Sequence, residues 1–186
     1  PGRYGIKYWI LADAENHYCY NAIPYLGKEN EELTVNLGAK VVKKLVEPIK
    51  GTNRNVTCDR YFTGVQLFEE LFNDNLTAVS TVMPNRKHLP LHLLPQQGRN
   101  REIGTSIFAF KDNMTMVSYH PKRSKFVLLL SSLHRNSNIA ESGKPEIIEF
   151  YNSTKAGVDA LDQKVRHYST YRKTFRWPLA VLYKIW

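Results

Sequence analysis

Strand-like and helix-like apolar patterns alternate along this chain, and their order constrains the fold more than any other feature. Two strands are predicted first, over residues 6–13 and 17–26, because both segments are rich in aromatic and β-branched residues and flank the turn-like Ala14-Glu15-Asn16. The next predicted elements are a helix over 37–46, a strand over 55–59, a helix from Thr63 to about 73–75 that opens with the capping-box pair Thr63 and Gln66, and a strand over 76–82. This order predicts an α/β fold with mixed strand directions.

The second half of the chain has a different pattern. A polar, proline-containing linker over 84–101 precedes an antiparallel β-meander predicted over 103–132. A polar loop over 134–145 then leads to the apolar residues 147–150. An apolar stripe beyond them predicts a final helix from about 153 to 169.

Length and composition limit the class of protein. With 186 residues and 42% apolar residues, the chain can form one core of ordinary size with a small inserted subdomain. No apolar run approaches the roughly 20 residues that cross a membrane, so we expect a soluble protein with no membrane partner. Cys19 and Cys58 are too few for a disulfide framework or a zinc module, which favours a reducing intracellular setting. The chain begins at Pro1 and ends within an apolar run, so we expect an excerpt from a longer protein.

The net charge of +9 is concentrated near the C-terminus. Six basic residues and no acidic residue follow Asp162: Lys164, Arg166, Arg172, Lys173, Arg176 and Lys184. Aromatic residues interleave with them: Tyr168, Tyr171, Phe175 and Trp177. This mixture suits contact with phosphates and stacking on unpaired bases. The alternative is a solvated basic helix whose aromatic residues belong to a core.

Three aspartates stand at the ends of predicted elements. Asp13 ends the first strand, Asp59 ends the third, and Asp159 lies near the start of the last helix. Converging carboxylates can hold a hard divalent cation such as Mg²⁺, and a two-ion site with its ions about 3.5–4 Å apart supports phosphoryl transfer. Asp162 shares a helix face with Asp159 and either joins that site or pairs with Arg166; we favour a supporting role.

Each aspartate also has a simpler interpretation. An aspartate after a strand is usually a turn or helix cap, and Asp59 before Thr63 fits that pattern. Asp159 also fits an ordinary first-turn acid, which the helix dipole favours. Spacing alone therefore leaves the metal site undecided.

The sequence motifs around the acids are more specific. They are Gly5-Ile6-Lys7 with Asp13, Thr57-Cys58-Asp59-Arg60-Tyr61-Phe62-Thr63, Thr81-Val82 with Asn85-Arg86-Lys87, Lys144-Pro145, the stretch 151–163, and Arg172-Lys173-Thr174-Phe175-Arg176-Trp177-Pro178. Together, in unbroken order, they resemble the piggyBac transposase family. The resemblance implies an RNase H-like (DDE transposase/integrase) core with a mixed sheet flanked by helices. That core would be split over 1–83 and 146–186, truncated at both ends, with a β-rich insertion over 84–145.

The resemblance also implies an activity: metal-dependent DNA cleavage and strand transfer in cut-and-paste transposition at TTAA sites. Asp13, Asp59 and Asp159 would be the catalytic metal ligands for two Mg²⁺ ions, with Mn²⁺ as a substitute and Asp162 as a supporting acid. The implied DNA-binding residues are Arg86, Lys87, Arg166, Arg172, Lys173, Arg176 and Trp177. The family works in the nucleus on transposon ends and target DNA, and the full-length protein would be a homodimer.

Some departures from the family pattern leave alternatives open. Met83 follows Thr81-Val82 where many members carry arginine, and Ala156 replaces a common glycine. The family's N-terminal DNA-binding and dimerisation region and its C-terminal cysteine-rich zinc domain have no counterpart here, so the fragment alone is expected to be inactive. One alternative is a domesticated, non-catalytic DNA- or chromatin-binding protein. A nuclease unrelated to transposition is the other, but it does not predict the 151–163 motif.

Overall fold

The computed structural model describes residues 7–25, 27, 36–86, 89–94, 101–123, 125–168, 172–179 and 182. The chain divides into two compact units. Unit 1 comprises Pro1–Val35 with Ala156–Trp186, and unit 2 comprises Asn36–Lys155. Among the described residues, no helix is both long enough and apolar enough to cross a membrane.

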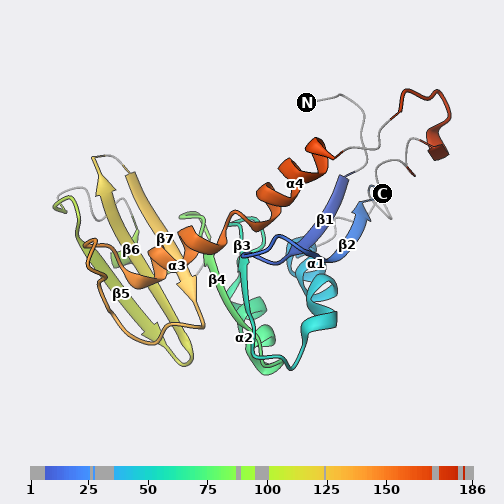
Figure 1. Ribbon diagram of the computed structural model, residues 1–186. Coiled ribbons are helices and arrows are strands. Elements are labelled where there is room, and N and C mark those ends of the chain that lie inside the picture. The colour runs from blue at the N-terminus through green and yellow to red at the C-terminus, as the bar shows by residue number, and fades with distance from the viewer. Residues whose placement is uncertain are drawn as a thin grey trace. The chain divides into compact units, whose positions relative to one another are not determined.

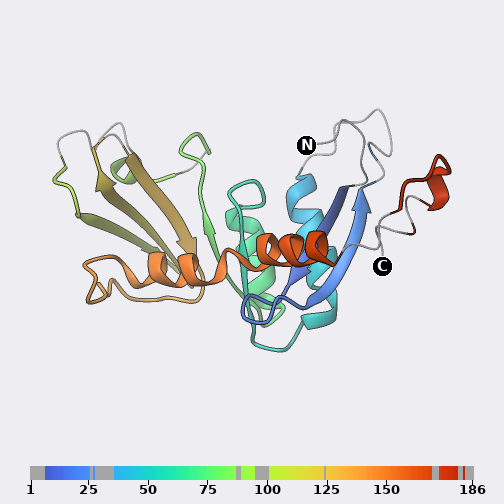
Figure 2. The same ribbon diagram turned by 45° about the horizontal axis from the view of Figure 1, so that its top comes forward.

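Unit 1 is built on the predicted hairpin, which the structure confirms. Strands β1 (Lys7–Ala12) and β2 (Cys19–Tyr25) pair antiparallel, with Lys7 opposite Tyr25 at one end and Ala12 opposite Cys19 at the other. The register shifts between Leu11 and Ala12, immediately before Asp13. Helix α4 (Gly157–His167) lies along β1 in Figures 1 and 2.

Unit 2 contains a five-stranded mixed sheet in the order β3-β4-β7-β6-β5. The strands are β3 (Asn55–Cys58), β4 (Thr77–Thr81), β5 (Ser106–Lys111), β6 (Met114–Lys122) and β7 (Lys125–Ser131). Only β3 and β4 run parallel, and every other pair is antiparallel. The predicted meander therefore forms as β5–β7, and its last strand pairs with β4.

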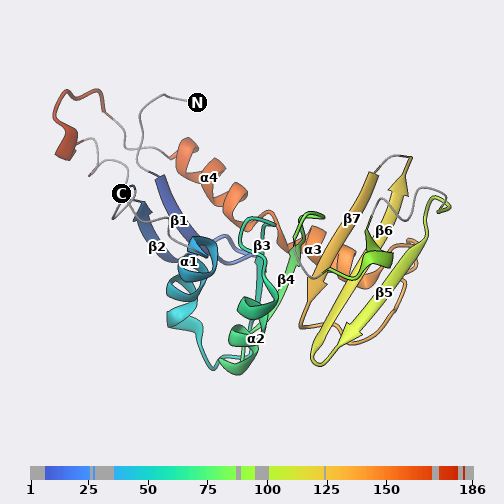
Figure 3. The same cartoon turned by 180° about the vertical axis from the view of Figure 1, so that it is seen from behind.

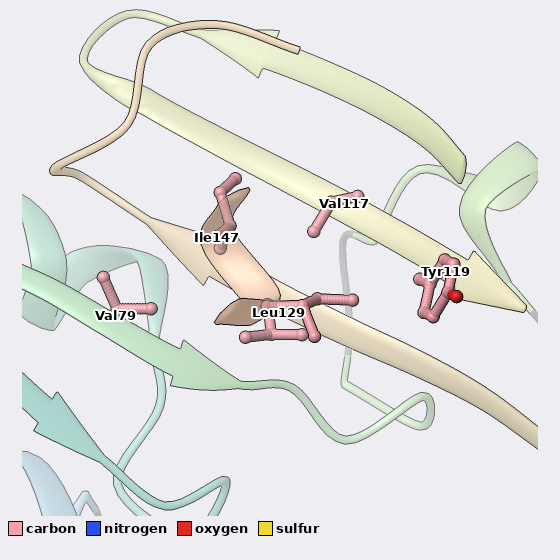
Figure 4. Close-up of a cluster of buried hydrophobic side chains, with 6 residues drawn as sticks. Val79, Val117, Tyr119, Leu129 and Ile147 are labelled. Atoms are coloured by element: carbon pink, nitrogen blue, oxygen red, sulfur yellow. The ribbon is translucent and has the colours of Figure 1, made fainter. Parts of the chain in front are cut away.

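Helices cover both faces of this sheet, as the opposite views in Figures 1 and 3 show. They are α2 (Val65–Asn73) and α3 (Glu146–Thr154). Unit 2 also contains α1 (Leu37–Val46) and short 3₁₀ turns at Glu47–Ile49 and Leu91–Leu93. Side chains alternate between the faces of a strand, so Val79, Val117 and Leu129 point to the α3 side. Ile147 of α3 packs among them in a buried cluster (Figure 4).

The fold class is therefore as predicted: a mixed α/β fold whose five-stranded sheet is flanked by helices. The strands of the predicted insertion continue the sheet that contains β3 and β4. The compact units divide at residues 35/36 and 155/156. The proposed division into 1–83 with 146–186 and 84–145 stays a prediction.

The helix predicted from about 153 to 169 is present as α4, but its predicted start is wrong, because residues 153 and 154 belong to α3. The structure has two helices there, α3 and α4, separated at Lys155 and Ala156. Helix α3 begins earlier, at Glu146, because Ile147 and Ile148 are buried against the sheet. Ala156, with φ −87° and ψ 0°, interrupts the regular helical backbone before Gly157 begins α4.

The predicted capping box is also wrong. Helix α2 begins at Val65, its N-cap is the extended Gly64, and no side chain of the described residues caps it. The Thr63 hydroxyl is 2.7 Å from the Thr81 carbonyl oxygen, to which it donates. Thr63 is buried, so this carbonyl on the neighbouring strand satisfies the hydroxyl in place of the helix end.

Candidate active site

Asp13 caps the turn that joins β1 to β2 in unit 1. Its Oδ1 accepts hydrogen bonds from the backbone N–H groups of Glu15 (2.8 Å) and Asn16 (2.9 Å). Its own N–H donates to the Tyr18 carbonyl at 2.8 Å. The turn-cap interpretation is therefore confirmed. It is compatible with metal binding, because an ionised carboxylate has two oxygens and about four acceptor sites.

Asp59 plays the same local role after β3 in unit 2. Its Oδ1 accepts a hydrogen bond from the Arg60 N–H at 2.6 Å, and its carbonyl accepts one from the Phe62 N–H at 3.0 Å. The residue is exposed. Among the described residues, no basic side chain forms an ion pair with Asp59. Its carboxylate is thus held in a turn and open to a ligand.

A buried hydroxyl pair supports the Asp59 turn from behind. Thr63 Oγ1 and Ser80 Oγ lie 2.5 Å apart, and neither residue is more than 3% exposed. The Ser80 hydroxyl is also within 2.7 Å of the Cys58 carbonyl, and Thr63 Oγ1 lies 3.3 Å from the Asp59 carbonyl. These bonds tie both ends of the turn to β4.

Helix α3 also reaches the end of β3. The hydroxyls of Thr57 and Thr154 share a hydrogen bond of 2.7 Å. One turn earlier, Tyr151 is half-buried; burial raises the pKa of its phenol, and the nearby Asp59 and Cys58 add to that effect. Sequence reasoning did not assign a role to Thr154 or Tyr151, although both lie in the 151–163 motif.

Asp159 and Asp162 lie on α4 in unit 1. Asp159 is an exposed residue in the first turn of the helix, as the simpler interpretation predicts. Asp162 Oδ2 lies 2.6 Å from Arg166 Nη2, so the predicted alternative of an ion pair is realised. Both partners are more than half exposed.

The donor set fits a hard cation, because Asp13, Asp59 and Asp159 supply only carboxylate oxygens, which Mg²⁺ prefers. Asp13 and Asp159 belong to unit 1, and Asp59 belongs to unit 2. Within the described part of the chain, no three acidic, histidine or cysteine side chains form a group that could hold a metal ion. The residues thus have the right chemistry, and their convergence stays a prediction.

The predicted DNA-binding residues are exposed wherever the structure describes them: Arg86, Arg166, Arg172, Lys173, Arg176 and Trp177. Lys87 lies outside the described residues. Tyr168, Phe175 and Trp177 are 81%, 96% and 77% exposed, so these three aromatic residues do not lie in a core. Tyr171, the fourth of the set, lies outside the described residues. Arg86 also donates to the Tyr61 carbonyl at 3.3 Å, beside the Asp59 turn.

The mixed five-stranded sheet, its flanking helices and the aspartates that follow β1 and β3 define an RNase H-like fold of the transposase class. The chain belongs to the family described as transposase IS4, whose model matches residues 1–186. It is also similar to a piggyBac transposase solved by cryo-EM as a synaptic complex with hairpin DNA, with a TM-score of 0.90 and 44% identity over 98% of this chain. The predicted resemblance to piggyBac transposases is thereby confirmed. The chain spans 38% of that protein.

Proposed function

We propose that this chain is the catalytic-core region of a piggyBac-type DNA transposase. It would cleave DNA and transfer strands during cut-and-paste transposition at TTAA sites. The observation that carries this proposal is the 44% identity to a piggyBac transposase over 98% of the chain, with a TM-score of 0.90. Regions that correspond to the rest of the similar transposase would supply the remaining DNA-binding and dimerisation functions, and the full-length protein would act as a homodimer in the nucleus.

In this proposal, Asp13, Asp59 and Asp159 hold two Mg²⁺ ions, with Mn²⁺ as a substitute. When bound, the ions supply activation of the attacking oxygen and stabilisation of the leaving oxygen. The chain's own contribution is to orient the carboxylates. The amides of Glu15 and Asn16 fix the Asp13 carboxylate, and the Arg60 amide fixes that of Asp59. Asp162 would remain a supporting acid through its pair with Arg166.

The DNA contacts would come from the exposed basic and aromatic residues. Basic side chains neutralise phosphates, and exposed aromatic rings stack on unpaired bases. The proposed set is Arg86, Lys87, Arg166, Arg172, Lys173, Arg176 and Trp177. The solved piggyBac transposase is a complex with hairpin DNA, which supports DNA as the partner here.

A domesticated, non-catalytic DNA-binding protein is the second candidate, and Met83 is the observation that favours it. Met83 is partly buried and lines a cavity of about 810 Å³ together with Arg86 and Lys111. A methionine cannot make the charged DNA contact expected of the arginine that many family members carry there. Loss of one contact weakens DNA binding but leaves the three aspartates in place. The two candidates therefore differ in whether the protein cleaves DNA.

The test is the Asp59→Asn variant of the full-length protein. We expect it to lose Mg²⁺-dependent cleavage of transposon-end DNA, because an amide is a poorer ligand for Mg²⁺ than a carboxylate. DNA affinity should stay within about twofold, because Asp59 contributes no positive charge to phosphate binding. Asp112→Asn is the matched control: Asp112 is an exposed turn residue with φ 51°, a conformation that asparagine also adopts.

The two candidates give different outcomes. Undiminished cutting by Asp59→Asn would refute the assignment of this residue. A wild-type protein that binds transposon ends but neither cuts them nor excises a marked element in cells would favour the domesticated alternative.

A further inference from the structure

Helix α4 approaches the Asp13 turn very closely at its first residue. Gly157 is buried, and a Cβ atom placed on it would lie 3.1 Å from the Asp13 carbonyl oxygen and 3.2 Å from Ala14 Cα. Both neighbours are backbone atoms, so neither can rotate aside as a side chain does. Glycine therefore permits an approach that any other residue would open by a few tenths of an ångström.

A second contact holds the same helix to the same turn. Lys164 Nζ donates a hydrogen bond to the Asn16 carbonyl oxygen at 3.0 Å. The Asn16 N–H in turn donates to Asp13 Oδ1 at 2.9 Å. Lys164 is one of the six basic residues near the C-terminus, but its ammonium binds the protein's own backbone.

The two contacts lie on one side of α4. Gly157 and Lys164 are seven residues apart, which places them about 20° apart around a helix with roughly 100° per residue. Asp159 lies roughly 140–160° away from both, on the side that also carries Asp162 and Arg166. The helix is thus anchored through Gly157 and Lys164, and neither acidic residue takes part in these two contacts.

We propose that Gly157 and Lys164 are positioning residues that clamp α4 to the Asp13 turn and thereby set the placement of Asp159 relative to Asp13. This inference rests on the proposed function, in which both aspartates bind metal. Ions about 3.5–4 Å apart tolerate little movement of their ligands. A displacement of about 1 Å can lower a reaction rate by about 10²-fold even when the mutation lies far from the chemistry.

The inference is tested in the full-length protein with Lys164→Met, which keeps most of the length of the side chain but removes its donors. Gly157→Ala perturbs the other contact. In the metal-free protein, we expect both variants to speed hydrogen–deuterium exchange in peptides covering residues 13–18. With metal, the single-turnover cleavage rate should fall at least about tenfold. Lys164→Arg, which keeps a donor, should restore most of both properties.

The controls separate positioning from DNA contact. Lys40 is an exposed lysine on α1, so Lys40→Met makes the same charge change elsewhere and should leave exchange over residues 13–18 unchanged. A positioning role leaves the salt dependence of DNA binding as in the wild type. The inference is overturned if Lys164→Met leaves turn exchange unchanged, or if it loses DNA affinity with a salt slope shallower by about 1, because Lys164 would then be a phosphate contact.

The proposed function fails by a different result. If the Asp159→Asn variant cleaves DNA as fast as the wild type, Asp159 is not a metal ligand and the proposed function is wrong in this respect. The exchange measurement on the metal-free Lys164→Met protein would still decide whether Lys164 holds the turn.

Discussion

The turns of Asp13 and Asp59 are built alike. Each follows a strand, and each is capped by the aspartate's own Oδ1. Each is also approached by a helix glycine: a Cβ on Gly157 would lie 3.1 Å from the Asp13 carbonyl, and a Cβ on Gly38 would lie 3.1 Å from the Tyr61 carbonyl. An aspartate turn that a helix glycine approaches thus occurs once in each unit, although Asp13 accepts from the amides of Glu15 and Asn16 and Asp59 from that of Arg60.

What lies behind the two turns differs. The Asp59 turn is tied to the buried Thr63 and Ser80, and every buried apolar side chain of the described residues lies between Val41 and Ile148, in unit 2. In the described part of unit 1, Gly157 is the buried residue. The Asp59 turn therefore depends on the interior of its unit, whereas the Asp13 turn depends on contacts at the surface of α4. We expect changes behind Asp59 to cost stability and changes behind Asp13 to cost mainly geometry.

The largest expected effect is that of Thr63→Val. Valine has nearly the same shape but removes the hydroxyl that donates to the Thr81 carbonyl and contacts Ser80 Oγ. At about 0.5–1.5 kcal/mol for each hydrogen bond, the expected loss is about 1–3 kcal/mol in the free energy of unfolding. Urea denaturation of this chain measures that loss.

Two controls sharpen the comparison between the units. Thr105 makes an exposed bond to the Glu102 carbonyl, so Thr105→Val should change the free energy of unfolding by less than about 0.5 kcal/mol. Lys164→Met in unit 1 should also change the free energy of unfolding by less than about 0.5 kcal/mol. If Lys164→Met lowers the free energy of unfolding as much as Thr63→Val does, the Asp13 turn depends on its contacts for stability as much as the Asp59 turn does.

Much of the fold follows from local sequence patterns. The hairpin of β1 and β2 and the helix over 37–46 were predictable, because alternation, β-branched content and helical spacing act over neighbouring residues. The division between α3 and α4 was not. It depends on the burial of Ile147 and Ile148 against strands that are distant in sequence, and a local apolar stripe carries no information about that contact.

Prediction of the site from the sequence is limited in the same way, because local patterns do not reveal contacts between distant residues. The sequence predicted that Asp13 and Asp59 could cap turns, which is a property of a few adjacent residues. The contacts that support these turns join distant residues, such as Thr57 with Thr154 and Lys164 with Asn16. The family resemblance identified the 151–163 motif. The structure shows which of its side chains form hydrogen bonds with distant parts of the chain.

Each unit contains one cysteine, so the reactivity of the two thiols offers a further comparison between the units, with a smaller expected effect. Burial raises the pKa of the Cys58 thiol to about 11, so only about 0.1% is thiolate at pH 8. Burial also raises the pKa of Cys19, but that residue is exposed. At pH 8, Cys19 should react with iodoacetamide at least about tenfold faster than Cys58, as measured by mass spectrometry of peptides.

The same shift predicts a dependence of stability on pH. The folded state keeps the Cys58 proton more tightly than the unfolded chain, whose thiol has its ordinary pKa of 9.0. The stability from this group is therefore complete below about pH 9 and is lost as the pH rises towards 11. A Cys58→Ser variant should show less of this loss. Equal reactivity of the two cysteines in the folded protein would contradict the partly buried environment of Cys58.

The smallest expected effect concerns the outer side of α4. The pair of Asp162 and Arg166 has an i,i+4 spacing and both side chains are more than half exposed, so it should contribute only about 0.3–0.5 kcal/mol. A double-mutant cycle with Asp162→Asn and Arg166→Gln, followed by urea denaturation, measures this coupling. A coupling above about 1 kcal/mol would mean that the pair stabilises unit 1, against the view that this side of α4 is free for ligands. With a weak coupling, Arg166→Gln should instead reduce the salt slope of DNA binding by about 1, because the guanidinium is then available to a phosphate.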